Sequence, residues 1–257
     1  MMKETTEIKM ADKLKIKIYE TREMMGRQAA HDVSEKIREL LAKQDFVNMV
    51  FAAAPSQNEF LSALSRNKDL DWSRINAFHM DEYIGLNKND PARFGNFLKE
   101  RLFGLAPFHE VHYLDGNTGD PAMECLHYTA LLRKYPTDIV CLGIGENAHL
   151  AFNDPHVAAF DDPLMVKEVD LAEASRRQQV NDGCFSRIEL VPSSALTLTI
   201  PALLRSKAVY CIVPGGNKAE AVYHTLHSGI SEVYPSTALR KHPGATLYLD
   251  KNSSEKI

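Results

Sequence analysis

Residues 138–145 read Asp138-Ile139-Val140-Cys141-Leu142-Gly143-Ile144-Gly145, and this stretch decides the fold because an apolar run passes directly into a glycine-opened loop. A short continuous apolar run is typical of a strand that is buried on both faces of a parallel sheet. The loop continues through His149 to Asp154. In an open α/β sheet, ligands bind beyond the carboxyl ends of the strands. The sequence therefore predicts a functional site in the loop after residue 142.

Strand and helix patterns alternate through most of the chain. Other apolar runs predict strands at residues 46–53, 74–79, 165–169, 195–199, 208–213 and 246–250. Apolar residues at helical spacing predict helices at residues 56–66, 91–103, 121–135, 201–207 and 218–226. This alternation indicates crossover connections within a mostly parallel sheet. We therefore expect a single α/β domain over residues 1–257, a three-layer open sheet with helices on both faces, with a candidate flap at residues 155–191.

The composition narrows the classes of function. The 257 residues are 44% hydrophobic and 25% charged, which is typical of a globular protein with a sizeable core. A net charge of −4 argues against a nucleic-acid partner, which requires clustered basic residues, but a few local cations suffice for a phosphorylated small molecule. The polar residues 1–12 lack the apolar core of a signal peptide, and no stretch approaches the roughly 20 apolar residues of a membrane span. The four cysteines lack metal-binding spacing. We expect a cytoplasmic protein with free thiols and no membrane partner.

The loop after residue 142 places a histidine between two acids. Imidazole is the side chain best suited to proton transfer near neutral pH, and either Glu146 or Asp154 could orient the His149 ring and fix its tautomer. Pro155 restricts the backbone of the residue before it, which helps to hold that acid in an extended loop. A histidine that is hydrogen-bonded in the core, or that caps a helix, is the structural alternative. The glycines, the preceding strand and the flanking acids favour a functional histidine.

A second acidic segment, Asp81-Glu82-Tyr83, follows the predicted strand at residues 74–79, and we expect it to form a loop. Adjacent carboxylates at a strand end can act as a general base, bind a metal or cap a helix. In extended backbone Asp81 and Glu82 point to opposite sides, so that only one of them faces a pocket. A metal is disfavoured because no third ligand accompanies them at a recognisable spacing. The choice between base and cap stays open on these residues alone.

Two turns between a strand and a helix are candidate phosphate sites. The turn Pro214-Gly215-Gly216-Asn217-Lys218 offers backbone N–H groups at a helix start together with a lysine, and both attract an anion. The turn lacks the spacing of a P-loop, so a single phosphate fits better than a nucleoside triphosphate. Ser56, in a similar turn, can cap the next helix or contact phosphate. A plain turn with a surface lysine is the alternative.

A polar run at residues 175–185 contains the pair Arg176 and Arg177. Arginine suits bidentate contacts with phosphate. An arginine pair on a helix more often lies on a solvated face. Arg176 is nevertheless our candidate for a phosphate-binding arginine.

Three segments together resemble the glucosamine-6-phosphate deaminase/isomerase family, which is related to the 6-phosphogluconolactonases. They are Met80-Asp81-Glu82-Tyr83-Ile84-Gly85-Leu86, residues 143–155 and Gly215-Gly216-Asn217-Lys218, and the similarity extends over residues 14–250. The resemblance implies a Rossmann-like fold of the deaminase/isomerase type. It also implies an aldose–ketose isomerisation that is coupled to loss of an amino group and that uses neither a metal nor a cofactor.

The resemblance assigns roles to individual residues. Asp81 would take the C2 proton of a hexosamine 6-phosphate and return it at C1, and His149 with Asp154 would open the sugar ring. Lys218 would hold the phosphate, and the products would be fructose 6-phosphate and ammonia. The C2 proton becomes acidic only in the open aldehyde, so ring opening and enolisation need separate proton carriers. The remaining candidate substrate contacts are Ser56, Glu82, Gly143, Gly145, Asn147 and Arg176.

The sequence departs from the family pattern at three places. Asn147 stands where the family has an aspartate, and Ala148 where it has a glycine. An amide cannot take a proton, so the role of that carboxylate would pass to Glu146, to Asp154 or to no residue. Asp154 stands where the family commonly has glutamate, and the turn at residues 53–57 lacks the family's glycine.

These departures keep two other functions open. A lactonase would use His149 to activate water and would need no C2 base. A sensor would bind a sugar phosphate without turnover. Asn147 and the altered phosphate turn are the two features of the chain that most favour a sensor. A homo-oligomer is also left open.

Overall fold

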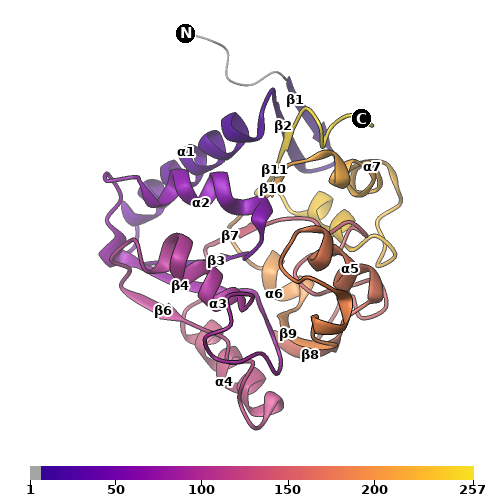
Figure 1. Ribbon diagram of the computed structural model, residues 1–257. Helices are drawn as coiled ribbons and strands as arrows, with labels where there is room; N and C mark the ends of the chain where they lie inside the picture. Colours follow the sequence, from indigo (N-terminus) through magenta and orange to yellow (C-terminus); the bar gives the residue numbers. More distant parts are fainter. Residues whose placement is uncertain (1–6) are drawn as a thin grey trace.

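The computed structural model describes residues 7–257 and contains an eight-stranded sheet in the order β1-β2-β11-β10-β7-β3-β4-β6 (Figure 1). Its strands are β1 Glu7–Ala11, β2 Leu14–Tyr19, β3 Val47–Phe51, β4 Ile75–His79, β6 Glu110–His112, β7 Ile139–Leu142, β10 Ala208–Val213 and β11 Ala245–Asp250. All neighbours pair in parallel except β1 and β2. The predicted mostly parallel sheet is therefore confirmed. Of the N-terminal stretch 1–12, residues 1–6 lie outside the described residues.

Helices connect the strands. They are α1 Arg22–Leu41, α2 Asn58–Ser65, α3 Phe94–Leu98, α4 Pro121–Lys134, α5 Glu173–Asn181, α6 Ile200–Leu204 and α7 Ala219–His227. Side-chain oxygens of Thr21, Asp120 and Thr199 accept backbone N–H bonds at the starts of α1, α4 and α6, as N-caps do. None of the helices in residues 7–257 is long and apolar enough to cross a membrane.

The sheet is covered on both faces because alternate strand residues point to opposite sides. In β3, Met49 and Phe51 join the apolar cluster that contains α1 and α2, whereas Val50 joins the cluster that contains α4, α6 and α7. β7 alternates in the same way. Each fully buried aliphatic or aromatic side chain stabilises the fold by about 1.5–3 kcal/mol. Two apolar cores, one on each face, therefore make the three layers that the sequence predicts.

A second, smaller sheet corrects two expectations. Its strands β5 Asp81–Tyr83, β9 Ser194–Leu198 and β8 Val166–Asp170 pair antiparallel in that order. The acidic segment at residues 81–83 is thus a strand and not a loop, and the strands near residues 165 and 195 do not join the parallel sheet. In β8, Glu168 and Asp170 lie on the same face and are exposed, whereas Val166 and Val169 are buried. The candidate flap, residues 155–191, contains β8 and α5; that it opens stays a prediction.

The strand order fixes where a ligand can bind. From β3 the chain continues outward to β4, whereas from β7 it continues in the opposite direction to β10. The neighbours β3 and β7 therefore flank a switch point, where the loops leave the carboxyl ends of the strands in opposite directions and leave a crevice.

Candidate active site

A cavity of about 60 Å³ lies at this switch point. Six of the predicted site residues line it, namely Ser56, Asp81, Gly143, Gly145, His149 and Lys218. They come from the carboxyl ends of β3, β4, β7 and β10. Further lining side chains come from the turn before α2, from α3, from the histidine loop and from α5. The sequence reasoning missed these residues: Gln57, Phe94, Phe152, Gln178 and Gln179. The structure thus brings the acid at residue 81, the imidazole and the lysine to one cavity.

The imidazole of His149 is held at Nδ1 by three oxygen atoms. Nδ1 lies 2.6 Å from Asn147 Oδ1, 3.1 Å from Ser175 Oγ and 3.3 Å from Asp154 Oδ1. Because the amide and carboxylate oxygens only accept hydrogen bonds, we assign the ring proton to Nδ1. The neutral ring then keeps a lone pair on Nε2, which is the atom left to exchange a proton with a ligand.

Asp154 is fully buried beside the ring. Its carboxylate accepts hydrogen bonds from Asn147 Nδ2 at 2.8 Å, from the backbone N–H of Ala172 at 3.1 Å and from the hydroxyl of Ser175. Burial by itself would raise the pKa of Asp154, but the hydrogen bonds and the charge of His149 outweigh it, and the pKa is lowered. The carboxylate therefore stays charged and can stabilise an imidazolium.

Of the two acids that could orient the ring, only Asp154 does so. The carboxylate of Glu146 instead accepts a hydrogen bond from Asn217 Nδ2 at 2.9 Å, and neither Glu146 nor Asn147 lines the cavity. Asn147 bridges the ring and Asp154, since its oxygen faces His149 and its nitrogen donates to the carboxylate. An aspartate at this position would set a second negative charge against Asp154, so the asparagine serves as an orienting group.

The histidine loop takes a tight course. Ala148 has φ 66° and Ala151 has φ 50°, both in the left-handed region that favours glycine. The turn closes through hydrogen bonds from Ala148 N to Gly145 O and from Gly145 N to His149 O, each 3.0 Å long. The ring lies directly against Gly145, where an added Cβ would come within 2.1 Å of His149 Cε1.

We therefore expect Gly145→Ala to push the imidazole out of place. A displacement of about 1 Å in a catalytic group costs roughly 100-fold in rate, so turnover should fall by about that factor. The measurement is kcat for the variant, with thermal unfolding to show that it folds. Gly229→Ala is the matched control, because a Cβ there meets nothing within 4 Å. Unchanged kcat in Gly145→Ala would show that the ring tolerates displacement.

Asp81 projects from β5 into the cavity, where it is 6% exposed. Within the described part of the chain its buried Oδ1 has no hydrogen-bond partner. Burial, together with the negative charge of Glu82, raises the pKa of Asp81 well above the ordinary value. An unpaired, buried carboxylate with a raised pKa is a strong base, and it is typical of a catalytic residue.

Glu82 points to the other side of β5, away from the cavity. Its carboxylate accepts the backbone N–H groups of Tyr83, Phe94 and Gly95 at 2.9–3.1 Å, and Arg93 Nε lies 3.5 Å away. It thus caps the start of α3. The expectation that Glu82 contacts substrate is wrong, because its oxygens are committed to this cap.

His79 supports Asp81 from behind and was not among the predicted residues. Its Nδ1 donates to the carbonyl of Asp81 at 2.8 Å, and its Nε2 accepts the N–H of Leu114 at 2.9 Å. Burial lowers the pKa of His79 to about 4, so the ring stays neutral. A neutral imidazole with both nitrogens occupied fixes the backbone that carries Asp81.

Lys218 is the one lysine or arginine among the residues that line the cavity. It is 4% exposed, and burial lowers its pKa, although Asp182 and Glu146 act in the opposite direction. Its turn begins at Gly215, whose φ of 96° requires a glycine. The N–H of Gly215 donates to the Asp250 carboxylate at 3.1 Å. Contrary to our expectation, this N–H group is therefore not open to an anion.

The candidate arginines lie outside the cavity. The guanidinium of Arg176 donates to the carbonyls of Ile188 and Val191 at 2.8–3.3 Å, and exposed Arg177 pairs with Glu173. Arg176 therefore clamps the chain after α5, and its assignment to substrate is wrong. The same polar run does reach the cavity, but through Gln178 and Gln179.

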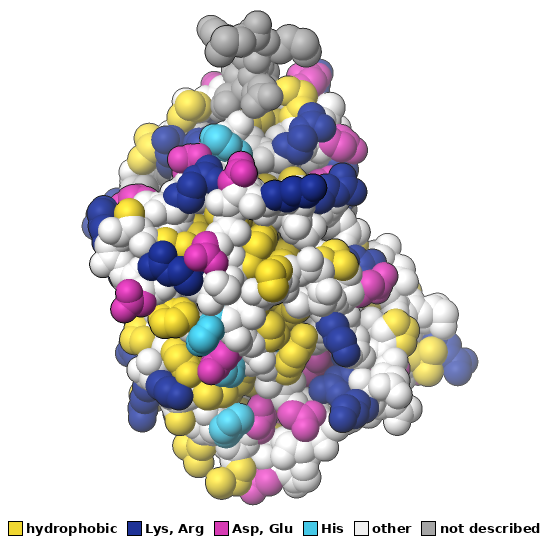
Figure 2. Space-filling view, turned by 90° about the vertical axis from the view of Figure 1, so that its left-hand side faces the viewer, with side chains coloured by type: hydrophobic (Ala, Val, Ile, Leu, Met, Phe, Trp, Pro, Cys, Tyr) yellow, Lys and Arg dark blue, Asp and Glu magenta, His cyan; other side chains and the backbone are white. Residues whose placement is uncertain are grey.

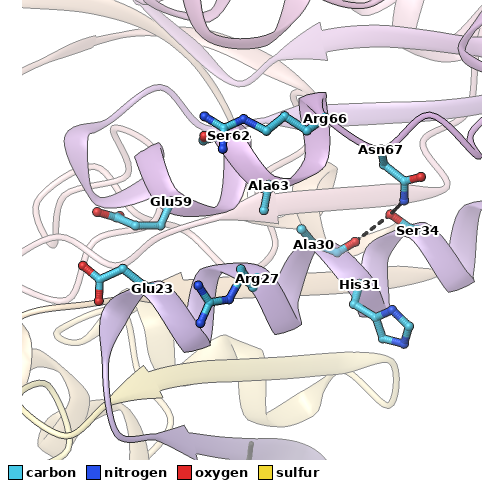
Figure 3. A pocket seen from close by; sticks show the side chains of 10 residues that line it. All are labelled: Glu23, Arg27, Ala30, His31, Ser34, Glu59, Ser62, Ala63, Arg66 and Asn67. Carbon is cyan, nitrogen blue, oxygen red and sulfur yellow. Dashed lines mark hydrogen bonds between the residues drawn. The ribbon is translucent and has the colours of Figure 1, made fainter.

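A larger cavity, about 550 Å³, lies between α1 and α2 (Figure 3). Arg27 and Arg66 project into it from the two helices, with Glu23 and Glu59 at one end. Among the described residues that line it, none lies at the end of a strand and no acid lies beside the histidine, whereas the switch-point cavity has both features.

On the side of the molecule that Figure 2 shows, acidic and basic side chains are interspersed. Among residues 7–257, no group of three or more His, Cys, Asp or Glu residues could hold a metal ion.

The sequence is similar to those of a known protein family. The model of the family described as glucosamine-6-phosphate isomerases/6-phosphogluconolactonase matches residues 20–248. The chain is 36% identical over 208 residues to a glucosamine-6-phosphate deaminase of Exiguobacterium sp., covering 81% of this chain and 79% of that protein. It is 33% identical over 217 residues to a glucosamine-6-phosphate deaminase of Bacillus thuringiensis, covering 84% and 80%.

Structural comparison agrees. A monomeric glucosamine-6-phosphate deaminase superposes with a TM-score of 0.86 and 28% identity, covering 94% of this chain and 99% of the other. A 6-phosphogluconolactonase from Thermotoga maritima superposes with a TM-score of 0.75 and 21% identity, covering 92% and 99%. At that identity the second likeness shows a shared fold alone.

Proposed function

The chain belongs to the family of glucosamine-6-phosphate isomerases and 6-phosphogluconolactonases, and on this premise we propose that it is an amino-sugar phosphate deaminase. Its substrate is a hexosamine 6-phosphate, first of all glucosamine 6-phosphate, and its products are fructose 6-phosphate and ammonia. One observation carries the proposal: an unpaired buried carboxylate, a carboxylate-backed imidazole and a lysine line one cavity.

The proposed steps use these groups in order. His149 Nε2 moves a proton from the C1 hydroxyl to the ring oxygen, the bond between C1 and that oxygen breaks, and an aldehyde forms. The aldehyde acidifies the C2 proton, which Asp81 removes while the substrate's ammonium group gives a proton to the C1 oxygen, so that an enol bearing a neutral amino group forms. Asp81 then returns its proton at C1, which leaves a protonated imine at C2. The resulting C2 imine takes up one water and releases ammonia, which leaves a ketone at C2. Lys218 holds the phosphate as a point charge.

The cavity is too small for this substrate as it stands. Ligand pockets of proteins span about 300–1,000 Å³, whereas this cavity has about 60 Å³. Gln178 and Gln179 of α5 form part of its wall. We propose that α5, which belongs to the candidate flap at residues 155–191, moves outward to admit a hexosamine phosphate.

An ammonia-release assay tests the proposal. We expect the purified protein to release ammonia from glucosamine 6-phosphate, with fructose 6-phosphate formed in equal amount. Galactosamine 6-phosphate is the epimer to compare. N-acetylglucosamine 6-phosphate is the matched control, because its amide nitrogen cannot leave as ammonia by this route. No ammonia from either free amine would count decisively against a deaminase.

A lactonase that acts on a phosphorylated sugar lactone is the second candidate. The observation in its favour is the His149–Asp154 pair, which is equally suited to activating water. A lactonase has no use for a base at C2, however, and Asp81 would then lie unpaired in the cavity without a task. The sensor is less favoured, since Asn147 orients the catalytic histidine. We place the enzyme in the cytoplasm. A homo-oligomer stays a prediction.

A further inference from the structure

Ser175 connects α5 to the proton-transfer pair. It lies in the first turn of α5 and is 2% exposed. Its hydroxyl donates to Asp154 Oδ1, and its oxygen lies 3.1 Å from His149 Nδ1. No other side chain of α5 has a hydrogen bond to either residue within the described part of the chain. Ser175 is not needed to cap its helix, so these contacts call for another explanation.

Asp154 is held by α5 at two points. Besides the Ser175 hydroxyl, the backbone N–H of Ala172, the residue before α5, donates to its other carboxylate oxygen at 3.1 Å. From the histidine loop itself, Asn147 Nδ2 donates to Asp154, and His149 Nδ1 lies 3.3 Å from its Oδ1. If α5 moves outward, Asp154 loses the donors Ser175 and Ala172, and the imidazole loses one of three oxygen neighbours.

The same helix closes the cavity. Gln178 lies one turn after Ser175; its side chain accepts the backbone N–H of Glu146 at 2.8 Å, while Gln179 faces the cavity. α5 therefore contacts the histidine loop at Glu146 and at Asp154. A movement that admits substrate must break both contacts, and closure must remake them.

We propose that Ser175 is a positioning residue that ties α5 to the Asp154–His149 pair, so that the imidazole is correctly placed only while α5 closes over the substrate. This inference rests on the proposed function of the same site. The histidine would then transfer protons in the closed state and not in the open one. Outer partners that orient metal-ligating histidines are worth about 10–100-fold in activity, and we expect a loss of the same order for a partner that orients a proton-transferring histidine.

The kinetic test compares Ser175→Ala with Ser175→Thr on glucosamine 6-phosphate. We expect Ser175→Ala to lose about 10–100-fold in kcat, while KM changes little because Lys218 still holds the phosphate. Ser175→Thr keeps the hydroxyl and should restore most of kcat. Ser65→Ala is the matched control, since that hydroxyl bonds only a carbonyl of its own helix. Wild-type kcat in Ser175→Ala, a change confined to KM, or equal losses in both variants overturns the proposal.

A second measurement works without turnover. Nitrogen-15 NMR of the His149 ring, assigned with His149→Gln, reports its protonation and tautomer. We expect the Nδ1–H form in the wild type and altered ring signals in Ser175→Ala, with the wild-type pattern restored in Ser175→Thr. A wild type that releases no ammonia from any hexosamine phosphate refutes the proposed function, and the ring signals then decide the role of Ser175. Ring signals that are unchanged in Ser175→Ala overturn the proposed role of Ser175.

Discussion

Asp81→Asn is expected to abolish turnover of glucosamine 6-phosphate while it makes the protein more stable. An amide cannot take the C2 proton, and a positioned general base contributes about 10²–10⁴-fold to the rate. The reverse reaction should fail equally, because the proton that the base returns at C1 is the one it removes at C2. The measurements are kcat for ammonia release and the exchange of the C1 proton of fructose 6-phosphate with solvent deuterium.

The gain in stability follows from the raised pKa of Asp81. Because the folded pKa lies above the unfolded value, the group stabilises the fold at pH below the unfolded pKa, and this contribution is lost as pH rises through the folded pKa. At neutral pH the charge of Asp81 therefore lowers the free energy of unfolding, and asparagine removes this destabilisation. Each kcal/mol gained would raise Tm by about 2–4 °C in a chain of this size.

Asp69→Asn, at an exposed position, is the matched control and should change neither quantity. As the pH is lowered, the wild-type rate should begin to fall at a higher pH than it would if Asp81 had the ordinary pKa of an aspartate. The reason is that Asp81 can accept a proton only when it is ionised. Retained activity in Asp81→Asn would exclude the C2 base and favour the lactonase.

His149→Gln should lose about 10²–10⁴-fold in kcat, because the variant has no group that can both give and take a proton at the ring oxygen. Substrate binding should survive, since Lys218 and the polar lining remain. The checks are kcat and the rise in Tm on adding glucosamine 6-phosphate, which reports binding alone. His127→Gln, an exposed histidine of α4, is the control of the same chemistry. Turnover within about tenfold of wild type would remove His149 from the mechanism.

The sequence predicts five consecutive strands of the large sheet well because each contains a mainly apolar run, whereas the strands β1, β2 and β6 were not predicted. The runs at β3, β4, β7, β10 and β11 are found within a few residues of their true ends. The same runs place the residues that follow them at one sheet edge, which is how Asp81, His149 and Lys218 could be assigned to one cavity. Strand direction accounts for the position of these residues, and the family resemblance suggested their roles.

The rest depends on contacts between segments far apart in the chain. α1 was not predicted, since charged residues interrupt its apolar face, although its packing against α2 is so close that a Cβ on Gly26 would meet Glu59 Cβ at 2.6 Å. β5 is too short to be recognised before its partner β9 is known. Arg176 and Gln178 belong to the same polar run, and only the way α5 docks decides that the amide and not the cation reaches the cavity.

The alternation of β5 limits how this enzyme can change in evolution. Asp81 and Glu82 have opposite surroundings, one facing the cavity without a partner and the other capping α3. Because side chains alternate along a strand, inserting or deleting one residue ahead of β5 would exchange the two acids. An indel between β4 and β5 would therefore turn the proposed base out of the cavity and remove the cap of α3 in a single event.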